Sequence, residues 1–95
     1  MLAVTKRAKQ ELKKILAAHV DYPMAGLRLS KSESDRFALN IDVEEPGDQV
    51  VKYEGSKVLL VDKELASALQ RTTIDIEDTP EGPRLTAFEE PWRQP

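Results

Sequence analysis

The stretch that decides the fold reads GSKVLLVDKELASALQ and spans residues 55–70. Its first part, Lys57 to Val61, is nearly all apolar and β-branched, which is typical of a strand that is covered on both faces. Asp62 follows at once and is a good N-cap for a helix over Lys63 to Gln70. Because this helix has only about two turns, it needs a sheet to pack on. The stretch therefore predicts a buried strand that leads into a short, packed helix.

Strand patterns lie on both sides of this stretch. Phe37 to Val43 alternates apolar and polar side chains, which is the pattern of a half-buried strand. Pro46 and Gly47 mark a turn after it, and Pro80 to Pro83 turns a closing hairpin. The expected strands are 26–29, 37–43, 49–54, 57–61, 74–77 and 84–88. Together they predict an α+β domain that is mainly β, with two small packed sheets and two covering helices.

A first helix is expected over Thr5 to Val20, because apolar residues recur there at the spacing of one helical face and Thr5 can cap the start. His19, the only histidine, falls near the centre of that apolar face in the last turn. We expect His19 to pack on the core or to reach free carbonyls rather than to bind a metal, since no partner lies at a ligand spacing. The residues predicted to form the core of the domain are Leu12, Ile15, Leu16, Leu29, Phe37, Leu39, Ile41, Val58, Leu60, Leu65 and Leu69.

Composition bounds the function without defining it. The 95 residues carry 14 basic and 17 acidic side chains, a formal net charge of −3, which predicts one small domain that is not a typical nucleic-acid binder. No apolar run is long enough to span a bilayer and no signal-peptide pattern is found, so we expect a cytoplasmic protein that does not bind membranes. The chain has no cysteine, which excludes disulfides, thiolate nucleophiles and zinc-thiolate sites.

The order of short motifs along the chain carries a family resemblance. The motifs are Leu2-Ala3-Val4-Thr5, Gly26-Leu27-Arg28-Leu29, Gly47-Asp48, Gly55-Ser56-Lys57-Val58-Leu59-Leu60-Val61-Asp62, Ile74-Asp75 and Glu81-Gly82. Each motif alone is common, and the specificity lies in their order and spacing. On these motifs nearly the whole chain resembles the HesB-like family of A-type iron-sulfur carriers. The resemblance implies a HesB-like domain over residues 1–88 and a C-terminal tail over residues 89–95.

In that family the cluster ligands are cysteines, one in a loop after the first strand and a Cys-x-Cys pair in the C-terminal tail. At these places the chain has Ser30 to Arg36 and Glu89 to Pro95, without cysteine. Because clusters prefer soft thiolate ligands, we expect no cofactor. The resemblance therefore implies an iron-sulfur assembly-related protein of a cysteine-free branch, which contacts other proteins instead of binding a cluster. Exposed edge strands would also permit a homodimer.

Alternatives to an interaction module stay open. Glu33 and Asp35 could hold a hard cation and make the chain a carrier of mononuclear iron, although a hydrated polar loop is the simpler interpretation. Candidate partner contacts are Ser32 and Arg36 in the same loop and Trp92 in the tail. The sequence contains no recognisable catalytic constellation, so we expect no enzyme activity.

Overall fold

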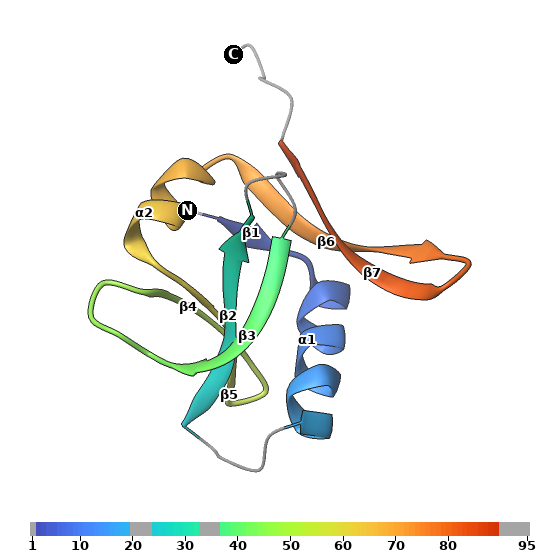
Figure 1. Ribbon diagram of the computed structural model, residues 1–95, viewed down its shortest axis with the longest axis horizontal. Coiled ribbons are helices and arrows are strands. Elements are labelled where there is room, and N and C mark those ends of the chain that lie inside the picture. The colour runs from blue at the N-terminus through green and yellow to red at the C-terminus, as the bar shows by residue number, and fades with distance from the viewer. Residues whose placement is uncertain (1, 20–23, 33–36, 90–95) are drawn as a thin grey trace.

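The computed structural model of the protein describes residues 2–19, 24–32 and 37–89. Along them the chain forms β1 (Ala3–Val4), α1 (Lys6–His19), β2 (Ala25–Lys31), β3 (Phe37–Val43), β4 (Gln49–Tyr53), β5 (Ser56–Val61), α2 (Lys63–Ala68), β6 (Thr72–Thr79) and β7 (Gly82–Glu89). Figure 1 shows the strands in two groups, with α1 beside them and α2 near the N-terminus. The predicted α+β, mainly β architecture is confirmed.

The strands form two small mixed sheets. One sheet has the order β3-β2-β5-β4, in which β2 and β5 run parallel and the outer strands pair antiparallel to them. The other has the order β1-β6-β7, with β1 parallel to β6 and β7 antiparallel. The chain therefore leaves three described strands of several residues at sheet edges, namely β3, β4 and β7.

Both helices begin where the sequence predicts. The Thr5 hydroxyl accepts a hydrogen bond from the Ala8 amide at 3.1 Å, and the Asp62 carboxylate accepts one from the Leu65 amide at 2.8 Å. Helix α1 packs against β5, β4 and β2 and also against β6, so it covers the core face of the four-stranded sheet rather than an edge. Within the described ranges, neither helix is long and apolar enough to cross a bilayer.

A bulge in β5 explains its continuous apolar run. The register passes from Val51 opposite Leu59 to Lys52 opposite Lys57, which leaves Val58 as the extra residue. Val58 and Leu59 are therefore both buried in the core. Leu60 is buried as well, next to Gly26, where an added Cβ would lie 3.2 Å from the Leu60 Cγ. A side chain larger than glycine at that position would push β2 away from β5.

The core only partly follows the sequence prediction. Leu12, Leu29, Val58, Leu60 and Leu69 are buried as predicted. The partly buried predicted residues that pack against the core are Leu16, Phe37, Leu39 and Leu65. The predictions for Ile15 and Ile41 are wrong, because these side chains are 38% and 52% exposed. Ile41 is exposed because β3 is an outer strand, whereas α1 packs chiefly on the other three strands of that sheet.

Candidate functional site

Most of the site residues predicted from the sequence lie outside the described part of the chain. These are Glu33, Asp35, Arg36 and Trp92, so their predicted roles stay predictions. Ser32 is described and is exposed directly after β2. The end of β2, the start of β3 and the end of β7 all lie at the upper end of the molecule in Figure 1. β7 includes Glu89, which the sequence assigned to the tail.

His19 is not a core residue, contrary to one of the two predictions for it. Its side chain is exposed at the end of α1, and its Nδ1 lies 2.9 Å from the Ile15 carbonyl oxygen. In the tautomer with a proton on Nδ1, the ring donates to a carbonyl of the last turn, as the second prediction holds. Among residues 2–19, 24–32 and 37–89, no three or more His, Cys, Asp or Glu side chains gather as a metal site would require.

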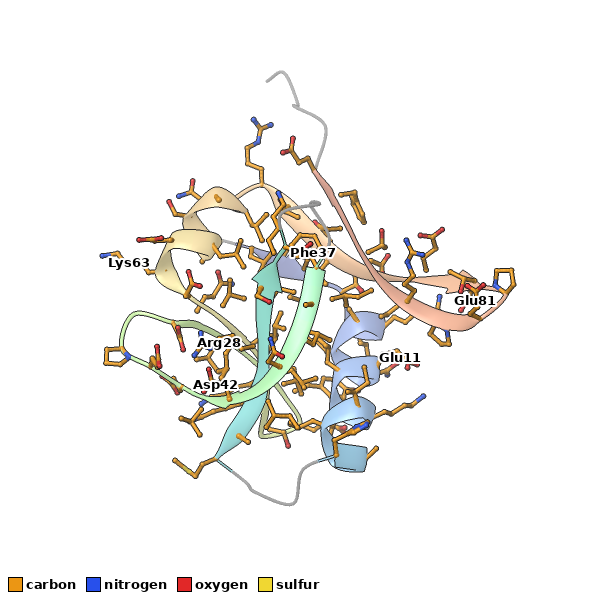
Figure 2. The ribbon with its side chains drawn as sticks, in the orientation of Figure 1. Glu11, Arg28, Phe37, Asp42, Lys63 and Glu81 are labelled. Carbon is orange, nitrogen blue, oxygen red and sulfur yellow. The ribbon has the colours of Figure 1, made fainter. Side chains whose placement is uncertain are left out.

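The strongest polar cluster among the described residues is centred on Arg28 of β2. Arg28 donates from Nε to Asp42 Oδ2 at 2.6 Å, and from Nη1 and Nη2 to the two carboxylate oxygens of Asp48 at 3.1 and 2.7 Å. Figure 2 shows Arg28 and Asp42 side by side where β2 meets β3. The Asp48 side chain is only 2% exposed and that of Arg28 14%. We call these three residues the Arg28 clamp.

The Arg28 clamp fixes the turn between β3 and β4. The Arg28 guanidinium is the main cause that lowers the pKa of Asp48 and of Asp42, and hydrogen bonding to Asp48 raises the pKa of Arg28. Asp48 also stabilises the turn from within, because its Oδ2 accepts a hydrogen bond from the Glu45 amide at 2.8 Å. The clamp is therefore a fixed ion-pair network whose groups are already engaged, rather than an open catalytic site.

Arg28 and Asp48 occur in two separate short motifs of the sequence. Arg28 belongs to Gly26-Leu27-Arg28-Leu29 and Asp48 to Gly47-Asp48, and no local pattern says that they meet. Their approach depends on β2 pairing with β3 and on the turn that brings Asp48 back to β2. An arginine between two leucines of a predicted strand and an aspartate directly after a turn glycine were the available signals.

An exposed apolar surface lies on the other face of β3 from the clamp, because Ile41 and Val43 alternate with Asp42 along the strand. Met24 before β2 and Ile41 and Val43 of β3 are 54%, 52% and 45% exposed. We call these three residues the β3 shelf. A hollow of about 560 Å³ lies at the Val43 end of the shelf. Its lining residues are Met24, Val43, Glu44, Glu45, Pro46 and Lys57. Lys57 Nζ lies 3.0 Å from Glu44 Oε1. An apolar surface with an acidic rim fits protein contact better than chemistry on a small substrate.

A second hollow lies between α1 and the β4–β5 turn, with a volume of about 540 Å³. Lys13 reaches across it to Glu54 Oε1 at 3.2 Å and lies 5.8 Å from the centre of the Tyr53 ring. Glu54 has φ of 49°, in the left-handed region that favours glycine and asparagine, and Gly55 follows with φ of 81°. Lys13 and Glu54 are thus paired with each other, and we interpret this hollow as part of the contact between α1 and the β4–β5 hairpin.

Comparison with known proteins places the fold. A scan against protein-family models finds no match, and a search of curated proteins finds none either. Escherichia coli SufA, described as involved in the biosynthesis of iron-sulfur clusters, matches with a TM-score of 0.73 and 19% identity over 93% of this chain and 84% of that chain. IscA, solved with a 2Fe-2S cluster, matches with a TM-score of 0.61 and 19% identity over 94% of this chain and 85% of that chain.

A third solved structure agrees with these two. It is a protein from Aquifex aeolicus determined in solution, with a TM-score of 0.67 and 23% identity over 94% of this chain and 91% of that chain. The chain thus has the HesB-like fold of A-type iron-sulfur carriers, and the resemblance stated from the sequence is confirmed for the fold. At these identities the likeness describes architecture, and function has to be argued from the residues.

The residues of this chain do not fit a conventional cluster. A protein-bound 2Fe-2S centre is held by cysteine thiolates, with histidine as the known substitute at part of the site. None of the 95 residues is a cysteine, and the single histidine is His19, which bonds its own helix. The chain therefore has the fold of iron-sulfur carriers but lacks the residues that ligate a cluster.

Proposed function

We propose that this protein is an interaction module of iron-sulfur assembly, which keeps the carrier fold and binds other proteins without carrying a thiolate-held cluster. One observation carries the proposal, namely a HesB-like fold over nearly the whole chain in a sequence without cysteine. A cytoplasmic location is part of the proposal, because SufA, which is described as involved in iron-sulfur cluster biosynthesis, shares the fold. The module would act through direct surface contact with its partners.

The β3 shelf supports the proposal from the side of the structure. Exposed apolar side chains gain the free energy of burial only when a partner covers them, and three lie together here beside acidic groups. By contrast, the charged groups of the Arg28 clamp and of the α1–turn contact are paired internally. The exposed side chains of the β3 shelf therefore favour contact with another protein surface.

In-cell photo-crosslinking tests the proposal. A photoreactive amino acid is placed singly at exposed positions of different surfaces, such as Lys14 on α1, Ile41 on β3 and Glu81 at the β6–β7 turn. The proposal predicts that at least one position gives a reproducible crosslink to a specific protein and that the others give none. Crosslinks from no position, or equally from every position to abundant proteins, would contradict an interaction module.

A further inference from the structure

Strand β3 is an open sheet edge. It pairs with β2 over seven consecutive residue pairs without a register shift, and among the described residues no strand pairs with its other side. Phe37 to Val43 contains no proline, glycine or basic residue, and its one charge, Asp42, is engaged by Arg28. A regular edge of this kind presents unpaired amides and carbonyls to any extended chain.

The other described edges are protected in ways that β3 is not. β4 pairs irregularly, because its register with β5 shifts between Val51 and Lys52 at the bulge of β5, and the Lys52 side chain is exposed. β7 contains Pro83 and an exposed Arg84. β1 is only two residues long. Irregular pairing, proline, charge and short length are the usual devices against edge-to-edge binding, and β3 has none of them.

The clamp sets how much of the edge is free. The Val43 amide donates to Asp42 Oδ1 at 2.7 Å, and Arg28 Nη2 donates to the Val43 carbonyl at 3.1 Å. Side chains of the protein itself thus satisfy the backbone of Val43, whereas its side chain stays exposed. An added strand can therefore pair with the backbone of residues 37–41. Past that point it would contact the side chains of the β3 shelf.

Charge around the shelf is unbalanced. Glu44 is paired with Lys57, but exposed Glu45 has no ion pair within the part of the chain that the structure describes. From residue 37 to residue 51 the sequence has four acidic residues, Asp42, Glu44, Glu45 and Asp48, and no basic one. An occupant that offers a cation at this end of β3 would find a free carboxylate.

We infer that β3 binds an extended segment of another protein by strand addition. That segment has apolar side chains at alternate positions, which cover Ile41 and Val43, and a lysine or arginine that reaches Glu45. A second copy of this chain fits less well, because its own residues 37–51 contain no basic side chain to offer. The inference rests on the proposed interaction function and names its surface and the chemistry of its partner.

A phage-displayed library of random twelve-residue peptides, selected on the purified full chain, tests the inference. We expect enriched peptides that alternate apolar residues and contain lysine or arginine. Added to isotope-labelled protein, a selected peptide should shift the amide signals of residues 37–45 and leave those of α1 and β7 in place. Enriched peptides that instead shift α1 or β7, or a selection that enriches no peptide, would overturn it.

Matched variants locate the contact. Ile41→Lys and Phe88→Lys each place a charge at an exposed apolar position on an edge strand, 52% and 48% exposed in the native protein. We expect Ile41→Lys to weaken peptide binding at least tenfold, Glu45→Gln to weaken it a few-fold, and Phe88→Lys to leave it unchanged. Equal effects of Ile41→Lys and Phe88→Lys would contradict the β3 site.

Sedimentation of the same proteins tests whether a second copy of the chain binds β3 instead. A native chain that dimerises, and that Ile41→Lys turns into a monomer, would assign β3 to a second copy and overturn the inference. The proposed function fails separately, through the crosslinking result, because that experiment does not depend on which surface is used. If crosslinks arise at Lys14 or Glu81 and not at Ile41, the interaction function stands and the β3 inference falls.

Discussion

The two outer strands of the four-stranded sheet, β3 and β4, differ in what covers them. β4 packs against α1, pairs with β5 across the β5 bulge and exposes a lysine, whereas β3 pairs regularly and exposes Ile41 and Val43. A thin core in a 95-residue chain can cover one face of such a sheet only in part. β4 thus contributes to the packed core, whereas β3 is the outer strand for which we infer binding.

Each outer strand has an ion pair near one end, through Arg28 or Lys13, and removing these two cations should give the largest contrast. Arg28→Ala leaves the nearly buried Asp48 carboxylate without its partner, and we expect it to lower the free energy of unfolding by about 3 kcal/mol. Lys13→Ala removes the exposed pair with Glu54 and the contact over the Tyr53 ring, with an expected loss below about 1 kcal/mol. Urea unfolding of both variants measures the difference, and equal losses would mean that the clamp does not hold the β3 end.

Apolar truncation sharpens the same contrast. Val51 of β4 is buried and Ile41 of β3 is exposed, so Val51→Ala should cost about 2 kcal/mol and Ile41→Ala less than about 0.5 kcal/mol. Thermal unfolding of the two variants provides the check. A cost for Ile41→Ala as large as that for Val51→Ala would show that the shelf is covered in the native protein.

Acid should weaken the Arg28 clamp. The pKa values of Asp42 and Asp48 are lowered in the folded protein by Arg28, while an unfolded aspartate titrates near about 3.9. The stabilisation is therefore complete above that pH and is lost as the pH falls through the lower folded values. We expect the difference in unfolding free energy between the native chain and Asp48→Asn to shrink as the pH is lowered from about 6 to about 3. Parallel curves would exclude the linkage.

The smallest expected effect concerns the turn that follows β4. Glu54 has a left-handed backbone, which asparagine tolerates better, so Glu54→Asn should stabilise the protein by about 0.5 kcal/mol. Glu54→Gln is the control, because it removes the charge that Lys13 contacts and keeps a long side chain. Stabilisation by both variants to the same extent would assign the effect to charge rather than to backbone strain.

Local patterns predicted much of the fold, and long-range geometry accounts for what they missed. Thr5 and Asp62 were recognised as caps because the groups that they bond lie three residues away. The alternation from Phe37 to Val43 indicated a strand, but alternation is the same in a central and an outer strand. The position of β3 at the edge, and hence the exposure of Ile41, depends on the strand order β3-β2-β5-β4.

The site was harder to predict for the same reason. The Arg28 clamp joins residues 14 and 20 positions apart, and its formation requires the β2–β3 register together with the turn before β4. The sequence instead drew attention to Glu33, Asp35, Arg36 and Trp92, which lie outside the described residues. What the sequence did establish is chemical, since the absence of cysteine from all 95 residues limits the ligands that the carrier fold can offer.

The most direct test of the account is reconstitution. The protein is purified without oxygen, its metal content is measured, and it is then incubated with ferrous iron and sulfide under reducing conditions. The account predicts no stable cluster absorption after desalting and iron far below one equivalent per chain, with a cysteine-containing protein of this fold loading in parallel. A stable cluster spectrum with stoichiometric iron and sulfide on this cysteine-free chain would contradict it.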